Sequence, residues 1–106
     1  IKRSLLRTGR LLAVDSSSES FSVASEVIAK ASIECHNELK SAPLRLSIKD
    51  APAPTSFGLT KKYYISSNEI FDTALDILNK PKINSQKLFK KDYPHDVPGD
   101  WFKGPF

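Results

Sequence analysis

The stretch that decides the fold runs from Lys49 to Leu78 and reads KDAPAPTSFGLTKKYYISSNEIFDTALDIL. Its second half predicts a helix from Ser67 to about Lys80, because Ser66 and Glu69 have the S-x-x-E spacing of a capping box. One face of this helix takes the apolar residues 70, 71, 74, 77 and 78. The two prolines near the beginning favour an extended loop, and a helical turn is expected at 59–64. The stretch thus predicts the end of a strand, a surface loop, and a helix that packs back.

The residues before this stretch predict two strands and two helices. Residues 1–8 read as the end of a helix, because Gly9 suits the position just past a helix terminus. The continuous apolar run in 10–15 predicts a strand covered on both faces, whereas the alternation in 44–49 predicts a strand nearer an edge. Between them, 16–20 is predicted to be a loop, and an apolar stripe from Phe21 to about Leu39 predicts a long helix.

The alternation of strands and helices predicts an α/β fold with three layers. We expect a mainly parallel sheet with helices on both faces. Two strands alone are marginally stable, so we expect only part of such a domain, in residues 1–80. Residues 81–106 are interpreted as an extended tail rich in proline and aromatic residues.

Composition and charge exclude several classes of protein. The chain is 40% apolar and 26% charged, as in ordinary globular proteins, and its net charge of +4 is spread over scattered residues. No apolar run approaches the ~18 residues of a membrane span, and the pattern of basic and aromatic residues does not fit a nucleic-acid-binding module. The single cysteine excludes an intramolecular disulfide and a multi-cysteine metal site. We expect an intracellular location, either cytoplasm or mitochondrial matrix.

No residue is predicted to be catalytic, to bind a cofactor, or to hold a metal. Cys35 falls in the apolar stripe and is expected in the core, while the adjacent His36 points about 100° away and cannot share a metal with it. His95 is expected in a turn. Asp72 and Asp76 are interpreted as solvent-exposed charges on one helix face.

Four apolar residues are predicted to contact a partner. Ile33 lies nearly opposite the apolar stripe of its helix, where it is either an ordinary exposed residue or a sign of a second face that a partner covers. Disordered tails are usually poor in aromatic residues, yet the tail contains Trp101, Phe102 and Phe106. We expect these three side chains to anchor the tail onto a surface, either its own or a partner's.

The order of these motifs resembles the C-terminal domain of the transketolase family, and most closely the beta subunit of the decarboxylase component of 2-oxo acid dehydrogenases. In that family a Thr-Gly-Arg-Leu turn enters a strand that ends in an acidic residue, as in 8–11 and Asp15. A D-x-P-x-P loop follows the next strand, as at Asp50, and a tyrosine precedes an S-x-x-[DE]-I helix, as at Tyr64. The likeness covers about residues 1–80.

The chain also departs from the family pattern. The family usually carries an acidic residue and a Gly-Gly-Phe-Gly segment after the first strand, where this chain reads SSSESFSVASEV. Any family role of that loop is therefore not expected here. The tail from Lys82 has no counterpart in the family, and the family domain has further strands and helices upstream of Ile1.

The resemblance implies a domain without catalytic residues. In the family, thiamine diphosphate and magnesium are held by other domains, and the parent reaction is oxidative decarboxylation of a 2-oxo acid with acyl transfer to lipoamide. The C-terminal domain builds subunit contacts and helps to dock the dihydrolipoyl acyltransferase core. The alternative interpretation from the residues alone is a small free-standing adaptor that binds a protein partner through its aromatic tail. A nucleic-acid-binding module would rest on charge alone.

Overall fold

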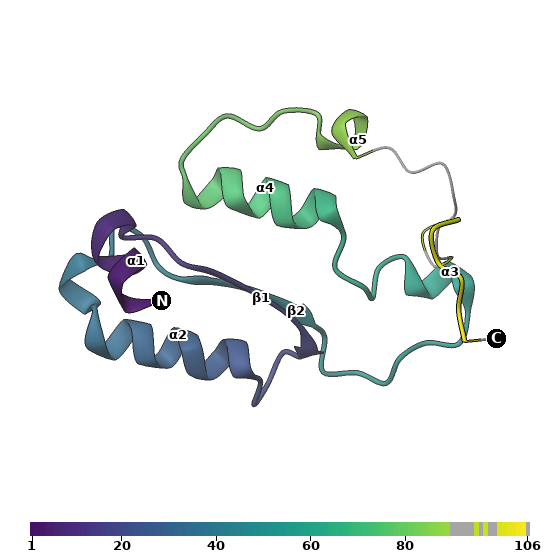
Figure 1. Cartoon of the computed structure of the whole chain (residues 1–106), viewed down its shortest axis with the longest axis horizontal. Coiled ribbons are helices and arrows are strands. Elements are labelled where there is room, and N and C mark those ends of the chain that lie inside the picture. The colour runs from purple at the N-terminus through teal and green to yellow at the C-terminus, as the bar shows by residue number, and fades with distance from the viewer. Residues whose placement is uncertain (90–94, 96, 98–99, 106) are drawn as a thin grey trace.

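The chain alternates helices and strands along most of its length (Figure 1). The structure is a computed structural model and describes residues 1–89, 95, 97 and 100–105. Its elements are α1 (Lys2–Thr8), β1 (Leu12–Ser18), α2 (Val23–Glu34), the 3₁₀ helix η1 (His36–Glu38), β2 (Leu44–Ile48), α3 (Phe57–Thr60), α4 (Ser67–Ile77) and α5 (Ser85–Leu88).

The strands β1 and β2 pair in parallel, which confirms the predicted α/β fold. Leu12 lies opposite Leu44, and the register shifts between Val14 and Ser18. Because β1 continues to Ser18, the predicted loop at 16–20 is wrong over its first three residues. Among the described residues each strand has a single neighbour, so each has one unpaired edge.

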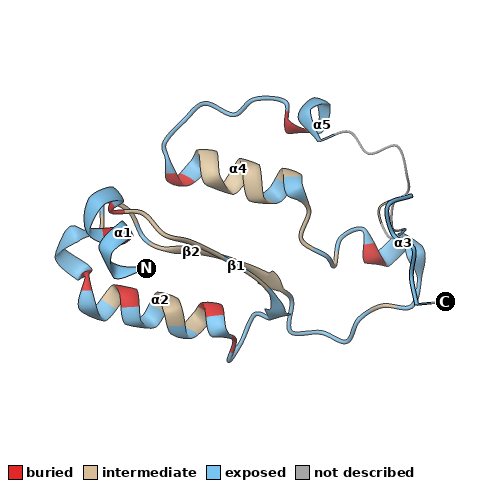
Figure 2. Ribbon diagram, viewed as in Figure 1, coloured by how far each residue is buried: buried red, intermediate tan, exposed pale blue. Residues whose placement is uncertain are grey.

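Helices lie on either side of the two strands in Figure 1. Figure 1 shows α2 on one side of the two strands and α4 on the other, with α1 at the end where the chain begins. The buried cluster sits between α1, α2 and the start of β1. It consists of Leu5, Ala31 and Cys35, against which Leu11 and Leu39 pack. Few other residues are fully buried (Figure 2).

The helix α2 differs from its prediction at both ends. Its cap is Ser22, whose Oγ accepts a hydrogen bond from the amide of Ser25 at 3.2 Å. Phe21 therefore lies outside the helix, with a φ of 55° and a fully exposed side chain, rather than in the apolar stripe. The helix ends at Glu34, and Cys35 is buried in the position just after it, which confirms its place in the core.

The helix α4 confirms the capping box. Ser66 accepts from the amide of Glu69 at 3.2 Å, and the Glu69 carboxylate accepts from the amide of Ser66 at 2.7 Å. Of the predicted apolar face, Ile77 is buried, while Leu78 lies just past the last helical residue and is 48% exposed. The predicted helical turn at 59–64 is found slightly earlier, at α3.

Two further expectations are corrected by burial. Val14 is 46% exposed, so β1 is not covered on both faces within the described part of the chain. Asp72 is half-buried rather than solvent-exposed, because its carboxylate accepts a hydrogen bond from Ser85 Oγ at 3.2 Å. That bond and the edge-on contact of Phe71 with Phe89, at 5.4 Å between ring centres, pack the α5 segment onto α4.

The chain exposes more surface than a compact protein of its size. Its accessible area is 8249 Å², whereas a monomer of 11.8 kDa is expected to expose about 5,900 Å². Its radius of gyration of 16.3 Å exceeds the value of about 13 Å for a compact domain of this length. None of the helices in the described ranges is long and apolar enough to cross a membrane.

Candidate functional site

The turn between α1 and β1 depends on a glycine. Gly9 has a φ of 67° and donates its amide to the Leu5 carbonyl at 2.7 Å, which ends α1 as predicted. Its own carbonyl accepts from the amide of Lys40 at 2.8 Å. A Cβ at this position would lie 2.7 Å from the Glu38 carbonyl oxygen. The turn therefore lies directly against the backbone at the end of η1.

The next residue ties this turn to the other side of the sheet. Arg10 Nε donates to the carbonyl oxygen of Ile77 at 2.9 Å. That carbonyl belongs to the last turn of α4, where carbonyls lack partners within the helix and a cation is favoured. The Thr-Gly-Arg motif thus has a physical role here: the glycine permits a close turn, and the arginine holds the end of α4.

Two aspartates close the opposite end of the strands. Asp15 accepts from the amides of Ser17 at 3.0 Å and Ala24 at 3.3 Å, which joins β1 to the first turn of α2. Asp50 accepts from the amide of Ser20 at 2.9 Å and from its hydroxyl. Hydrogen bonds from Ser17 and from Ser20 hold the pKa values of Asp15 and Asp50, respectively, below their usual range. Both carboxylates are therefore ionised at neutral pH.

A cleft of about 480 Å³ opens at this same end of the sheet. We call it the strand-end cleft, and among the residues that line it are Ser16, Ser18, Phe21, Lys49, Asp50 and Tyr63. The Tyr63 hydroxyl donates to the Ala51 carbonyl at 2.9 Å and so holds the proline-containing loop. Sequence reasoning matched Tyr64 to the family's tyrosine, but it is Tyr63 that contacts the loop. No sequence signal had singled out this cleft, because its residues come from three separate segments.

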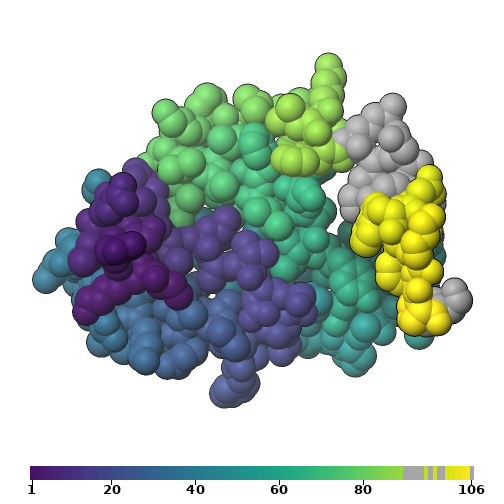
Figure 3. All heavy atoms as spheres, in the orientation of Figure 1, coloured from purple at the N-terminus to yellow at the C-terminus, as the bar shows by residue number. Residues whose placement is uncertain are grey.

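The predicted partner contacts lie at two ends of the molecule. Ile33 is 81% exposed in the last turn of α2. Trp101 is 74% and Phe102 43% exposed, with their rings edge-on at 6.0 Å. Residues 100–105 lie beside α3, far from the end of α2 (Figures 1 and 3). Phe106, the fourth predicted contact, lies outside the described residues.

His95 fastens the C-terminal segment to α3. Its Nε2 lies 3.1 Å from the carbonyl oxygen of Phe57. The same nitrogen lies 2.9 Å from Thr60 Oγ1, and the His95 ring packs on Phe57 at 4.3 Å. Sequence reasoning predicted the turn at His95, which is present, and missed this contact.

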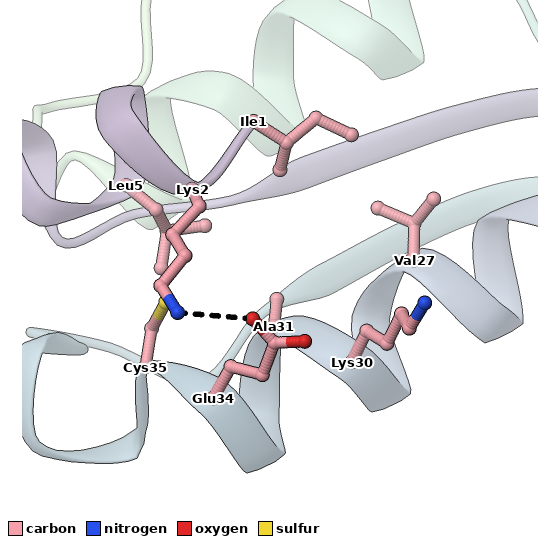
Figure 4. Close-up of a pocket in the computed structure, with 8 residues that line it drawn as sticks. All are labelled: Ile1, Lys2, Leu5, Val27, Lys30, Ala31, Glu34 and Cys35. Atoms are coloured by element: carbon pink, nitrogen blue, oxygen red, sulfur yellow. Dashed lines mark hydrogen bonds and ion pairs between the residues drawn. The ribbon is translucent and has the colours of Figure 1, made fainter.

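A smaller apolar pocket of about 170 Å³ separates α1 from α2 (Figure 4). Leu5 and Cys35 lie at one end of it, and Ile1 and Val27 at the other. Its rim carries an ion pair between Lys2 and Glu34 at 3.1 Å, and this carboxylate raises the pKa of Lys2 above its usual value.

No cluster for metal chemistry is found in the part of the chain that the structure describes. There, no three His, Cys, Asp or Glu side chains lie close enough to hold an ion. His36 is exposed on η1, beside the buried Cys35. The strand-end cleft is one place where the fold brings polar groups from separate segments together.

Comparison with known proteins agrees with the motif order. No protein-family model matches the chain. Over 78 residues, 74% of its length, the chain is 30% identical to the protein from Cyanidium caldarium named pyruvate dehydrogenase E1 component subunit beta. The chain spans about a quarter (24%) of the length of that relative. The chain therefore contains a region similar to the beta subunit of a 2-oxo acid dehydrogenase.

Proposed function

We propose that this chain is a non-catalytic assembly and subunit-interface domain of a thiamine-diphosphate-dependent 2-oxo acid dehydrogenase beta subunit, with the transketolase C-terminal fold. The observation that carries the proposal is the surface that the chain leaves uncovered. Its accessible area of 8249 Å² exceeds the expectation for a compact monomer by roughly 2,300 Å². An excess of this size is that of a large, permanent protein interface.

The character of the exposed residues supports an interface. Val23 and Ile33 are each more than three-quarters exposed on α2. A single exposed apolar residue needs no cause, but two on one short helix favour contact with another protein surface. The unpaired edges of β1 and β2 add backbone donors and acceptors that invite a further strand.

The internal contacts of the motif residues support the family assignment. The Thr-Gly-Arg turn packs against the residues after η1 and holds α4, and Asp50 at the start of the D-x-P-x-P loop holds the residues before α2. These roles are structural, which fits a domain that positions other parts of an enzyme. In the parent enzyme, thiamine diphosphate and magnesium would be bound by other domains, and the reaction would be oxidative decarboxylation of a 2-oxo acid.

The partners in this proposal are other subunits or domains of the parent enzyme and the dihydrolipoyl acyltransferase core. Ile33, Trp101, Phe102 and Phe106 are the proposed contacts. For the full-length protein, sedimentation velocity with and without the acyltransferase core tests these contacts. Ile33→Asp is expected to weaken assembly, whereas Ser67→Asp, which adds the same charge at an exposed position at the start of α4, is not. If the two variants assemble equally well, Ile33 is not part of the interface.

Cofactor binding provides a second test. Calorimetry with thiamine diphosphate and Mg²⁺ is expected to show no binding to the 106-residue chain. Micromolar binding by the chain alone would show that the proposed division of roles is wrong.

A second candidate function rests on the C-terminal segment. His95 pins this segment to α3 while Trp101 stays largely exposed, as expected of an adaptor that presents an aromatic anchor to a partner. Under this alternative, Trp101→Ala alone would abolish partner binding and Ile33→Asp would leave it unchanged.

A further inference from the structure

We propose that the strand-end cleft binds a free α-amino acid with an apolar side chain, a role that goes beyond assembly and does not depend on it. The cleft lies outside the carboxyl ends of two neighbouring parallel strands, β1 and β2. In open α/β sheets this is where ligands bind. Its volume of about 480 Å³ falls within the range of small-molecule sites.

The Asp50 carboxylate in the cleft is held in place by hydrogen bonds within the protein. Both carboxylate oxygens of Asp50 accept hydrogen bonds from Ser20, one from the amide at 2.9 Å and one from the hydroxyl. Each oxygen keeps a further lone pair, because a carboxylate accepts about four hydrogen bonds. A fixed, ionised carboxylate of this kind suits an ammonium group.

A cationic group stands beside it. Lys49 lines the same cleft, directly before Asp50 in the chain. In the described ranges, no carboxylate lies within ion-pair distance of Lys49. A ligand that carries both an ammonium and a carboxylate would match both charges, whereas a neutral polyol would match neither and a simple anion would be repelled by Asp50.

Phe21, which lines the cleft, has an unusual backbone conformation. Phe21 has a φ of 55°, which is an outlier for a bulky side chain, and its ring is fully exposed. Such strain persists only where the surroundings impose it, and it concentrates at ligand sites. The ring faces of Phe21 and Tyr63 can attract an ammonium, and Ile48 and Pro52 supply apolar surface for a side chain.

The hydroxyls of the cleft complete the match. Ser16 and Ser18 belong to the last part of β1, and both line the cleft. The Ser16 hydroxyl can donate to a ligand carboxylate, whereas the Ser18 hydroxyl already donates to the Ser20 carbonyl oxygen at 3.3 Å. The Tyr63 hydroxyl already donates to Ala51, so its lone pairs remain to accept from an ammonium.

The test is calorimetric titration of the protein with L-leucine. We expect a dissociation constant of about 1 mM or lower, as a ligand of this size allows. Two analogues separate the charges: 3-methylbutylamine lacks the carboxylate and 4-methylpentanoate lacks the ammonium. Each is expected to bind at least about tenfold more weakly, since each loses a charge-assisted hydrogen bond.

Three variants complete the design. Asp50→Asn and Phe21→Gly are each expected to weaken L-leucine by about tenfold, whereas Asp76→Asn, an exposed carboxylate on α4, is not. If Asp50→Asn disturbs the proline-containing loop, Phe21→Gly still tests the proposal. This variant is not expected to disturb the fold, because the Phe21 ring is fully exposed and glycine readily adopts a positive φ. Three results would each overturn the proposal. They are no heat of binding at an L-leucine concentration tenfold above the expected dissociation constant, binding of the neutral polyol ribitol as tight as that of L-leucine, and an unchanged affinity for L-leucine in Phe21→Gly.

Discussion

Replacing Gly9 with alanine is expected to damage the fold severely. Two costs combine in the Gly9→Ala variant. The φ of 67° places an alanine in the left-handed region, which costs about 1–2 kcal/mol. The added Cβ would also lie 2.7 Å from both the Glu38 carbonyl oxygen and Lys40 Cγ. The lysine side chain can move, but the backbone oxygen cannot, and overpacking of this kind costs about 1–3 kcal/mol.

The two costs give a loss of about 2–5 kcal/mol in the free energy of unfolding. With a urea m-value of about 1–2 kcal/mol per molar, the midpoint of denaturation falls by at least about 1 M. Far-UV circular dichroism of the protein in a urea series measures this shift. The same turn contains Arg10, so Gly9→Ala is also expected to weaken the hydrogen bond from Arg10 to the Ile77 carbonyl at the end of α4.

Gly58→Ala is the matched control. Gly58 lies in α3 with ordinary backbone angles, and the nearest atom to an added Cβ is Ser56 Oγ at 4.0 Å. Alanine there is expected to be neutral or to stabilise the protein by about 0.5–1 kcal/mol. If the two variants show the same midpoint, the close approach of the α1–β1 turn to the backbone after η1 is wrong.

Three further predictions concern the described residues. Ile77→Ala is expected to cost about 2–4 kcal/mol by opening a cavity, and Ser66→Ala about 1 kcal/mol by removing a cap; the reverse order in urea denaturation would show that the buried face of α4 is misplaced. Phe21→Gly is expected to leave thermal stability unchanged or raise it by about 1 kcal/mol, because it relieves a positive φ and removes no buried contact; a lower Tm would contradict this. The folded pKa values of Asp15 and Asp50 are lowered, so the stability they contribute is present above about pH 4 and is lost as pH falls through the folded values. Urea midpoints measured from pH 6 to pH 2 should therefore fall at the acid end, and less steeply in Asp15→Asn; equal slopes would refute the role of that carboxylate.

The sequence predicted those parts of the fold that depend on local chemistry. The capping box at Ser66 and Glu69 and the glycine that ends α1 each act within one turn of a helix, so their spacing is sufficient evidence. The parallel pairing followed from the alternation of strands and helices. Cys35 was placed correctly in the core because the apolar stripe extends past the last turn of α2.

The errors arose where a contact from a distant segment decides the structure. Phe21 continues the apolar stripe in spacing, yet Ser22 caps the helix and leaves Phe21 outside it. Asp72 is drawn inward by Ser85, a residue of the segment that was interpreted as tail. The strand-end cleft joins the ends of β1 and β2 with Tyr63, and no local pattern encodes that juxtaposition.

The measurement that tests the central claim most directly is sedimentation of the 106-residue chain. The large uncovered surface and the unpaired strand edges predict that the isolated chain is stable only with help from the rest of its parent protein, a partner subunit or self-association. At micromolar concentration the chain alone should therefore self-associate or lose cooperative unfolding, and the full-length protein should restore it. A compact monomer that unfolds cooperatively, and that is unaffected by deletion of residues 93–106, would contradict the account.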